Sequence, residues 1–130
     1  MSKTPPAWLL PGPFPAEFPT EERCFITELM NDPACPEVSL ALARVAPGVT
    51  TRLHHLLGTV ERYLILADTG IVEIAGQSAP VAPGDRVLIP ADTPQRITAT
   101  GPAPLEFHCL CTPRFRPENY VDQIGRASCR

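Results

Sequence analysis

Turn-forming residues divide most of this chain into short segments, and this division limits its fold more than any other feature. From residue 23 onward, runs rich in Val, Ile, Leu, Thr and Phe alternate with turn sequences such as Pro47-Gly48 and Pro83-Gly84-Asp85. We expect strands near 23–30, 38–46, 50–57, 60–67, 70–75, 85–89, 94–100 and 104–111. No stretch before residue 115 has the periodicity of a helix. The pattern therefore predicts an all-β barrel or sandwich.

The two ends of the chain differ from this central part. Prolines are concentrated between Pro5 and Pro19, which predicts an extended arm over residues 1–20 that lies on the domain or on a partner subunit. Residues 21–116 form the predicted barrel. In residues 117–130 a proline is followed by Glu118, and Tyr120, Val121 and Ile124 would share one face, so we expect a short helix and then a tail.

Composition excludes several classes of function. The 130 residues carry a net charge of −3 and 6% aromatic side chains, so neither nucleic acid nor an anionic membrane is an expected partner. The apolar runs are too short to cross a bilayer. Five cysteines without an export signal favour thiols over a disulfide framework, and we expect a cytoplasmic protein whose ligand is a small molecule.

Two segments have informative spacings. In the first, Gly48 is followed after five residues by His54, and Glu61 comes seven residues after this histidine. In the second, Gly84 is followed after five residues by Pro90.

These spacings resemble the two motifs of the cupin family, over roughly Gly48 to Ala99. Four positions depart from the family pattern: Leu56 and Gln95 replace histidines, and Asp68 and Asp92 replace turn glycines. Aspartate is one of the few residues that tolerate a left-handed turn conformation, so the two aspartates fit the fold. The resemblance implies a cupin double-stranded β-helix, or jelly-roll barrel, for this all-β chain.

Strand parity suggests which side chains enter the barrel. Residues two apart on a strand point to the same face, so His54 should point inward and His55 outward. Glu61 and Tyr63 would enter from the next strand, and Gln95 from across the barrel.

The resemblance also implies a metal site. In the full cupin pattern three imidazoles and one carboxylate hold a divalent ion; here the predicted ligands are His54, Glu61 and Gln95, and the predicted ion is Mn(II), Fe(II) or Zn(II). A second imidazole would require His55 or His108 to be recruited through a bulge.

Two functions are compatible with these residues. The first is an enzyme of dioxygenase, isomerase, lyase or cyclase type, either metal-dependent or metal-free. In the metal-free form Glu61, made more basic by an apolar barrel, would be the general base with His54 or Tyr63 as its proton partner. The second is a non-catalytic binding or sensing module in which Arg52, His54 and Gln95 hold the ligand.

Plainer interpretations exist for the same side chains. His54 could be a half-buried strand histidine bonded to a carboxylate, Glu61 a solvated edge residue, and Gln95 a hydrogen-bonding residue that follows a turn. For the assembly we expect a homodimer, in which the proline-rich arm crosses onto the neighbouring subunit.

Overall fold

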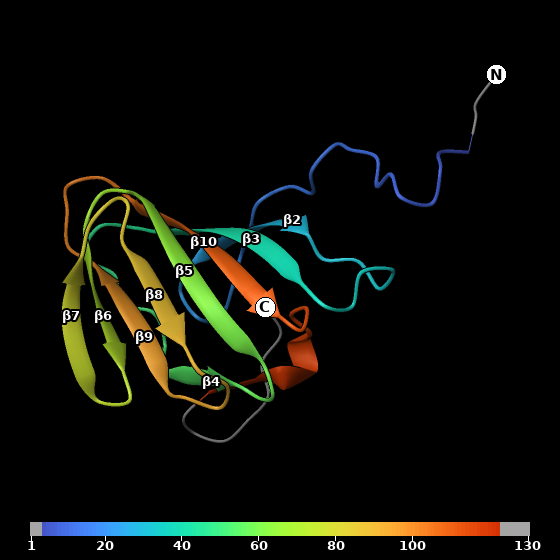
Figure 1. Ribbon diagram of the computed structural model, residues 1–130. Coiled ribbons are helices and arrows are strands. Elements are labelled where there is room, and N and C mark those ends of the chain that lie inside the picture. Colours follow the sequence, from blue (N-terminus) through green and yellow to red (C-terminus); the bar gives the residue numbers. More distant parts are fainter. Residues whose placement is uncertain (1–3, 123–130) are drawn as a thin grey trace.

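The computed structural model describes residues 4–122, which form two antiparallel β-sheets that face each other (Figure 1). The six-stranded sheet has the order β1-β2-β3-β10-β5-β8, and the five-stranded sheet has the order β11-β4-β9-β6-β7. The first comprises β1 (Phe18–Pro19), β2 (Phe25–Met30), β3 (Ser39–Val45), β10 (Leu105–Thr112), β5 (Val60–Ala67) and β8 (Arg86–Ile89). The second comprises β11 (Tyr120–Asp122), β4 (His54–Leu56), β9 (Gln95–Ala99), β6 (Gly70–Ile74) and β7 (Gln77–Val81). The all-β jelly-roll prediction is confirmed.

Alternation of buried and exposed side chains fixes the register of the strands. In β3 and β10 every second residue is buried, as expected where one face of a strand packs on a core. The main core lies between the sheets and includes Ile26, Ile65, Ile97 and Phe107. A smaller cluster of Leu56, Cys111, Phe115 and Tyr120 lies apart from it.

The two aspartates at turn positions adopt the backbone conformation expected of the glycines they replace. Asp68 has a φ of 64° and Asp92 a φ of 62°, both left-handed. Each carboxylate also accepts backbone hydrogen bonds across its loop, from Ala103 N to Asp68 Oδ2 at 3.0 Å and from Gly58 N to Asp92 Oδ1 at 2.9 Å. Aspartate thus supplies the turn geometry and a loop contact together.

Two of the strand predictions need revision. Residues 77–81 form β7, although their polar residues and Pro80 gave no strand signal; β7 is an edge strand, where proline is tolerated. The predicted strand 50–57 is regular only over β4, and the part before it follows β9 through a single bridge between Thr50 and Thr98.

The predicted C-terminal helix is wrong within the described residues. Pro117–Asn119 forms one turn of 3₁₀-helix, and the chain then continues as β11, which pairs with β4 through Tyr120 and Leu56. Pairing buries Tyr120 and Asp122, and this tertiary contact outweighs the local helical pattern. Ile124 and the predicted tail lie outside the described residues.

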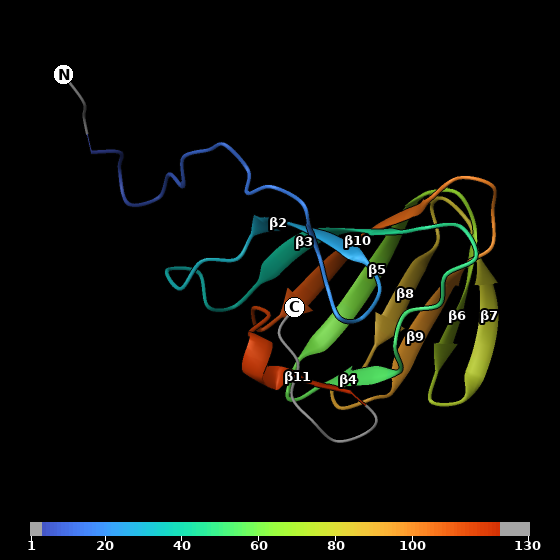
Figure 2. The same ribbon diagram turned by 180° about the vertical axis from the view of Figure 1, so that it is seen from behind.

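The described part of the N-terminal arm runs away from the barrel (Figure 1, Figure 2). Trp8 is 82% exposed and Phe14 is 68% exposed. Close to the barrel the arm is tied down by the ion pair between Glu17 and Arg44, at 2.7 Å, and by the short pairing of β1 with β2. Within residues 4–122 no helix has the length and hydropathy needed to cross a membrane.

Candidate functional site in the barrel interior

The interior between the two sheets contains a cluster of polar side chains. His54, Glu61 and Gln95 are 3%, 3% and 1% exposed, and Glu22 is 8% exposed. Tyr63, on β5 two residues after Glu61, is buried beside them. The structure therefore places all the inward side chains suggested by parity inside the barrel, and adds Glu22 to them.

His54 begins β4 and is held by three contacts. Its Nδ1 donates a hydrogen bond to the carbonyl oxygen of Arg52 at 2.7 Å, because a carbonyl can only accept. Its Nε2 lies 3.6 Å from Oε2 of Glu22. The ring stacks on Tyr120, with centroids 4.7 Å apart. The imidazole is thus fixed in orientation, with Nε2 directed at a carboxylate.

Glu22 is the site residue that the sequence motifs did not reveal. It lies in the turn between β1 and β2, where the Cys24 thiol donates to its Oε1 at 3.3 Å. The backbone N–H of Arg52 donates to the Glu22 carbonyl at 3.1 Å, which attaches this turn to the segment before His54. Its signal in the sequence is parity, because Glu22 lies two residues before Cys24 and four before Ile26, both of which are buried.

Tyr63 and Gln95 form a buried hydrogen-bonded pair. The Tyr63 hydroxyl donates a hydrogen bond to Oε1 of Gln95. Gln95 is the residue of β9 that pairs with His54 of β4. Burial raises the pKa of Tyr63 well above its ordinary value, and the negative charge of Glu61 adds to the rise. Tyr63 therefore stays protonated and acts as a donor.

Glu61 enters the interior from β5, opposite Cys111 of β10. The Cys111 thiol donates to Oε2 of Glu61 at 3.6 Å. Beyond Cys111 lies Leu56, which belongs to the same small apolar cluster and fills the place of the second motif histidine. One side of Glu61 is therefore apolar, and the other faces the cavity.

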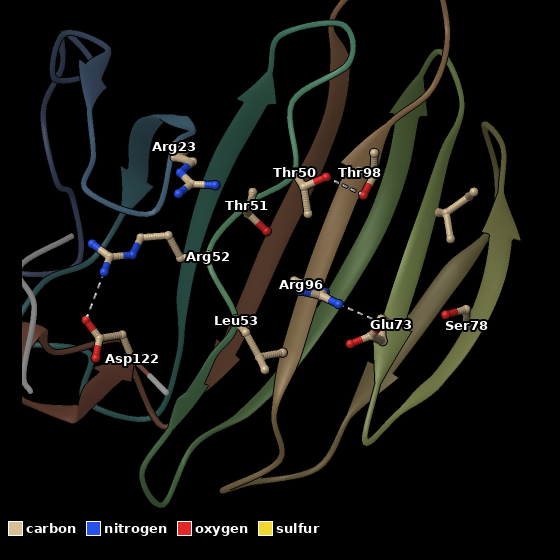
Figure 3. Close-up of a pocket in the computed structure, with 11 residues that line it drawn as sticks. Arg23, Thr50, Thr51, Arg52, Leu53, Glu73, Ser78, Arg96, Thr98 and Asp122 are labelled. Carbon is tan, nitrogen blue, oxygen red and sulfur yellow. Dashed lines mark hydrogen bonds and ion pairs between the residues drawn. The ribbon is translucent and has the colours of Figure 1, made fainter. Parts of the chain in front are cut away.

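The cavity at the centre of this cluster measures about 10 Å³ and is lined by Glu22, His54, Glu61 and Tyr63 among others. This is the space of about one water molecule. Arg52, the other predicted ligand-binding residue, lies outside. Its side chain lines a surface hollow and forms an ion pair with Asp122 at 3.5 Å (Figure 3). Residues 50–53 are not a regular strand, so Arg52 does not follow His54 into the barrel.

The arrangement does not fit a divalent ion held by His54, Glu61 and Gln95. Within residues 4–122 no group of three or more His, Cys, Asp and Glu side chains is arranged so that it could hold a metal ion. The amide oxygen of Gln95 already accepts the Tyr63 hydroxyl. His55 lies on the opposite face of β4 from His54, and His108 lies on the outer face of β10, so neither lines the cavity. We derive no step through a metal.

Comparison with known proteins places the fold in a family. No family model matches the chain. An uncharacterized protein of Methanocaldococcus jannaschii, MJ1618, is 32% identical over 102 residues, which cover 77% of this chain and 82% of the relative. Among solved structures, the Cnp3 cupin domain of Schizosaccharomyces pombe superposes with a TM-score of 0.66 at 9% identity, over 74% of this chain and 69% of that domain. The chain belongs to one family with the Methanocaldococcus jannaschii protein, and its fold is that of a cupin domain.

A second solved structure covers nearly the whole of this cupin. Pac13 of Streptomyces, described as a nucleoside dehydratase, was solved with uridine in a variant that carries phenylalanine in place of a tyrosine. It superposes with a TM-score of 0.73 at 11% identity, over 94% of this chain and 95% of that protein. At this identity the likeness shows the fold alone.

Proposed function

We propose that this cupin binds a small organic molecule in its barrel and acts on it by acid–base chemistry, as an isomerase or a lyase. The observation that carries the proposal is the gathering of Glu22, His54 and Glu61 around one cavity, next to the main apolar core. Burying an ionised group costs several kcal/mol of hydration. A barrel that served only as a scaffold would be more stable with apolar side chains there, and such clusters are typical of functional sites.

His54 is the proposed proton carrier. The Arg52 carbonyl holds Nδ1 and directs Nε2 toward Glu22. When Nε2 accepts a proton from a substrate, the Glu22 carboxylate at 3.6 Å stabilises the resulting imidazolium. Stacking on Tyr120 limits rotation of the ring during the transfer.

Glu61 and Tyr63 are the proposed partners of His54. Glu61 is placed to act as a general base from the opposite sheet. Tyr63 has a single hydroxyl proton, which it gives to Gln95, and it donates to a developing oxyanion when that proton turns from Gln95 to the substrate. Gln95 holds the Tyr63 hydroxyl in position. Abstraction and return of a proton require two groups that exchange protons, here His54 on β4 and Glu61 on β5, and a hydrogen-bond donor, here Tyr63 on β5.

The proposed reaction class is one that this fold can accommodate. Pac13 is described as a dehydratase, and loss of water from an alcohol is an acid–base elimination. The shared fold carries no information about the substrate of this chain.

Ligand binding in the barrel requires movement of the turn that carries Glu22. A cavity of about 10 Å³ admits no organic molecule. The turn lies between β1 and β2, which pair through Phe18 with Ile26 and Pro19 with Phe25, and the bond from Arg52 N to the Glu22 carbonyl is the contact that its movement would break. We propose that substrate displaces Glu22 on binding and that the turn closes again over the complex.

A nuclear magnetic resonance screen tests the proposal. Hydroxylated small molecules, uridine among them, are added to protein kept in chelator, and methyl and ring signals of the interior are followed. We expect a binder to shift signals of Ile97, Phe107 and Tyr120, and to lose affinity at least tenfold in both His54→Gln and Glu61→Gln. Matched controls are Glu106→Gln and His108→Gln, which change the same residue types on the outer face of β10.

The alternative predictions give different outcomes in the same screen. Binding that appears only with added Mn(II), Fe(II) or Zn(II) and depends on His54, Glu61 and Gln95 would support the metal-dependent enzyme. Binding in chelator without turnover would support the non-catalytic module. Binders that leave every interior signal unmoved would contradict both the enzyme and the interior site.

We further propose that this cupin forms a homodimer through the outer face of the six-stranded sheet. Leu40, Leu42, Leu64, Leu66, Leu88 and Leu110 point outward there, and Leu88 is 72% exposed. A second copy is the favoured occupant because each chain also carries an exposed apolar arm, with Trp8 and Phe14, that leaves its own barrel bare.

The four described cysteines are thiols, in keeping with a cytoplasmic location.

A further inference from the structure

A surface hollow of about 570 Å³ lies on the outer side of the five-stranded sheet, next to the turn that carries Glu22 (Figure 3). It is bounded by the turn, by the segment before β4, and by β6, β7, β9 and β11. Its lining combines three arginines, two carboxylates, four hydroxyl side chains and two apolar ones: Arg23, Arg52, Arg96, Glu73, Asp122, Thr50, Thr51, Thr98, Ser78, Leu53 and Ile71. The volume is in the usual range of small-molecule sites.

The hollow has more positively charged than negatively charged side chains. Arg96 pairs with Glu73 at 3.1 Å, and Arg52 pairs with Asp122 at 3.5 Å. The side chain of Arg23 makes no hydrogen bond or ion pair within residues 4–122. Among the described residues the hollow therefore contains one arginine side chain without a partner, although the chain as a whole has a net charge of −3.

Local structure holds Arg23 beside Arg52. Residues 22 and 23 point to opposite sides of the turn, so Glu22 enters the barrel while Arg23 lies outside. The turn is fixed by the hydrogen bond from Arg23 N to the Thr20 carbonyl at 3.3 Å, and the bond from Arg52 N to the Glu22 carbonyl joins it to the next segment. Figure 3 shows both arginines at the same end of the hollow.

The ion pair with Asp122 orients the Arg52 side chain and leaves part of its guanidinium available to a ligand. Asp122 is 3% exposed in its side chain, whereas the Arg52 side chain is 26% exposed. A guanidinium has five N–H donors in a planar fork, so a single carboxylate contact at 3.5 Å leaves several donors for a ligand. The hydroxyls of Thr50 and Thr98, 2.8 Å apart, supply further polar groups toward the middle of the hollow.

We infer that this hollow binds the anionic group of a small hydroxylated molecule, a carboxylate or a phosphate, through Arg23 and Arg52. Both oxyanions are recognised by arginine in the same way, by paired N–H donors. The hydroxyls and the apolar side chains of Leu53 and Ile71 line the hollow and would contact the rest of the molecule.

The inference rests on the proposed function and gives its substrate class. Thr51 lines both the surface hollow and the interior cavity, so the two are separated by one side chain and the turn. An anion held by Arg23 pulls on the turn whose other side carries Glu22. Substrate anchored outside would thus be positioned beside His54 when the turn moves.

Titration with two anions tests the inference. Inorganic phosphate and tartrate are added to the protein at low salt, and amide signals of Arg23, Thr50 and Arg52 are followed by nuclear magnetic resonance. We expect at least one anion to shift these signals saturably. Tighter binding of tartrate indicates a carboxylate ligand, and tighter binding of phosphate indicates a phosphorylated one.

Arg23→Asn is the decisive variant. Arg23 has a φ of 70°, and asparagine tolerates this left-handed conformation, so the change removes the charge without straining the turn. Arg86→Gln, on the exposed strand β8, removes the same charge elsewhere as the control. We expect a tenfold or greater loss of anion affinity in Arg23→Asn and none in Arg86→Gln.

The outcomes separate this inference from the proposed function. Loss in Arg23→Asn together with retention in His54→Gln supports the anion site even if the interior chemistry is wrong. Equal affinity of Arg23→Asn and the unsubstituted protein, or no shift with either anion up to tens of millimolar, would overturn the inference and leave the interior site to its own screen.

Discussion

Raising the pH above about 10 should destabilise this cupin through its two tyrosines. Tyr63 is 4% exposed and Tyr120 is 2% exposed, and they are the two tyrosines of the chain. Burial raises the pKa of both hydroxyls well above the ordinary value. The second contribution is the negative charge of a nearby glutamate, Glu61 for Tyr63 and Glu22 for Tyr120, which raises the pKa further. The folded state therefore holds two protons that the unfolded state releases.

The sign and size follow from linkage. A raised pKa in the folded state contributes stability that is fully present below the unfolded value of about 10 and is lost as pH rises beyond it. Each tyrosine gives a slope of about 1.4 kcal/mol per pH unit, so the pair gives about 2.7 kcal/mol per pH unit. Lysine and cysteine titrate in the same range, and only a comparison between variants isolates the tyrosines.

The assay is chemical unfolding at stepped pH, with tyrosinate absorbance followed in parallel. Tyr63→Phe and Tyr120→Phe should each reduce the alkaline slope by about 1.4 kcal/mol per pH unit. The folded protein should show no tyrosinate until it unfolds. Tyrosinate appearing in the folded protein near pH 10, or a slope unchanged by Tyr63→Phe, would refute the buried arrangement of these hydroxyls.

Three further predictions follow from the loops, the motif positions and the outer face. Asp92→Ala should cost about 2 kcal/mol of stability, because it strains a left-handed turn and removes the hydrogen bond from Gly58 N. Asp92→Gly should cost less, and equal losses of the two variants in thermal unfolding would argue against backbone strain. The double variant Leu56→His with Gln95→His restores both motif histidines and should bind Zn(II) measurably by titration calorimetry, whereas Glu73→His should not. Leu88→Lys should shift the homodimer toward monomer in light scattering, and an unchanged mass would exclude this face.

Much of the fold follows from residues that act locally. Turn chemistry and alternation predict the central strands, and the motif spacing predicts that His54 and Glu61 enter the barrel. The left-handed aspartates at 68 and 92 were foreseeable because few other residues tolerate that conformation. These features depend on neighbouring residues along the chain, which is why sequence patterns carry them.

Features set by distant contacts were not predictable in this way. Residues 120–122 have a helical pattern but pair with β4, and β7 is stabilised by its partner β6 rather than by its own composition. Glu22 contacts His54 only because the turn between β1 and β2, which is distant from His54 in the sequence, covers the barrel. Arg52, which was expected to hold a ligand in the barrel, lies outside it because the segment before β4 is not a regular strand.

The central claim is that the site works by acid–base chemistry with protein side chains alone. Measuring the metal content of the protein tests this claim most directly. The protein is purified without chelator and without nickel resin, and its Mn, Fe and Zn are measured by mass spectrometry beside His54→Ala. The account predicts far less than one metal ion per chain in both samples. Near-stoichiometric metal in the unsubstituted protein that disappears in His54→Ala would contradict it and restore the site of His54, Glu61 and Gln95.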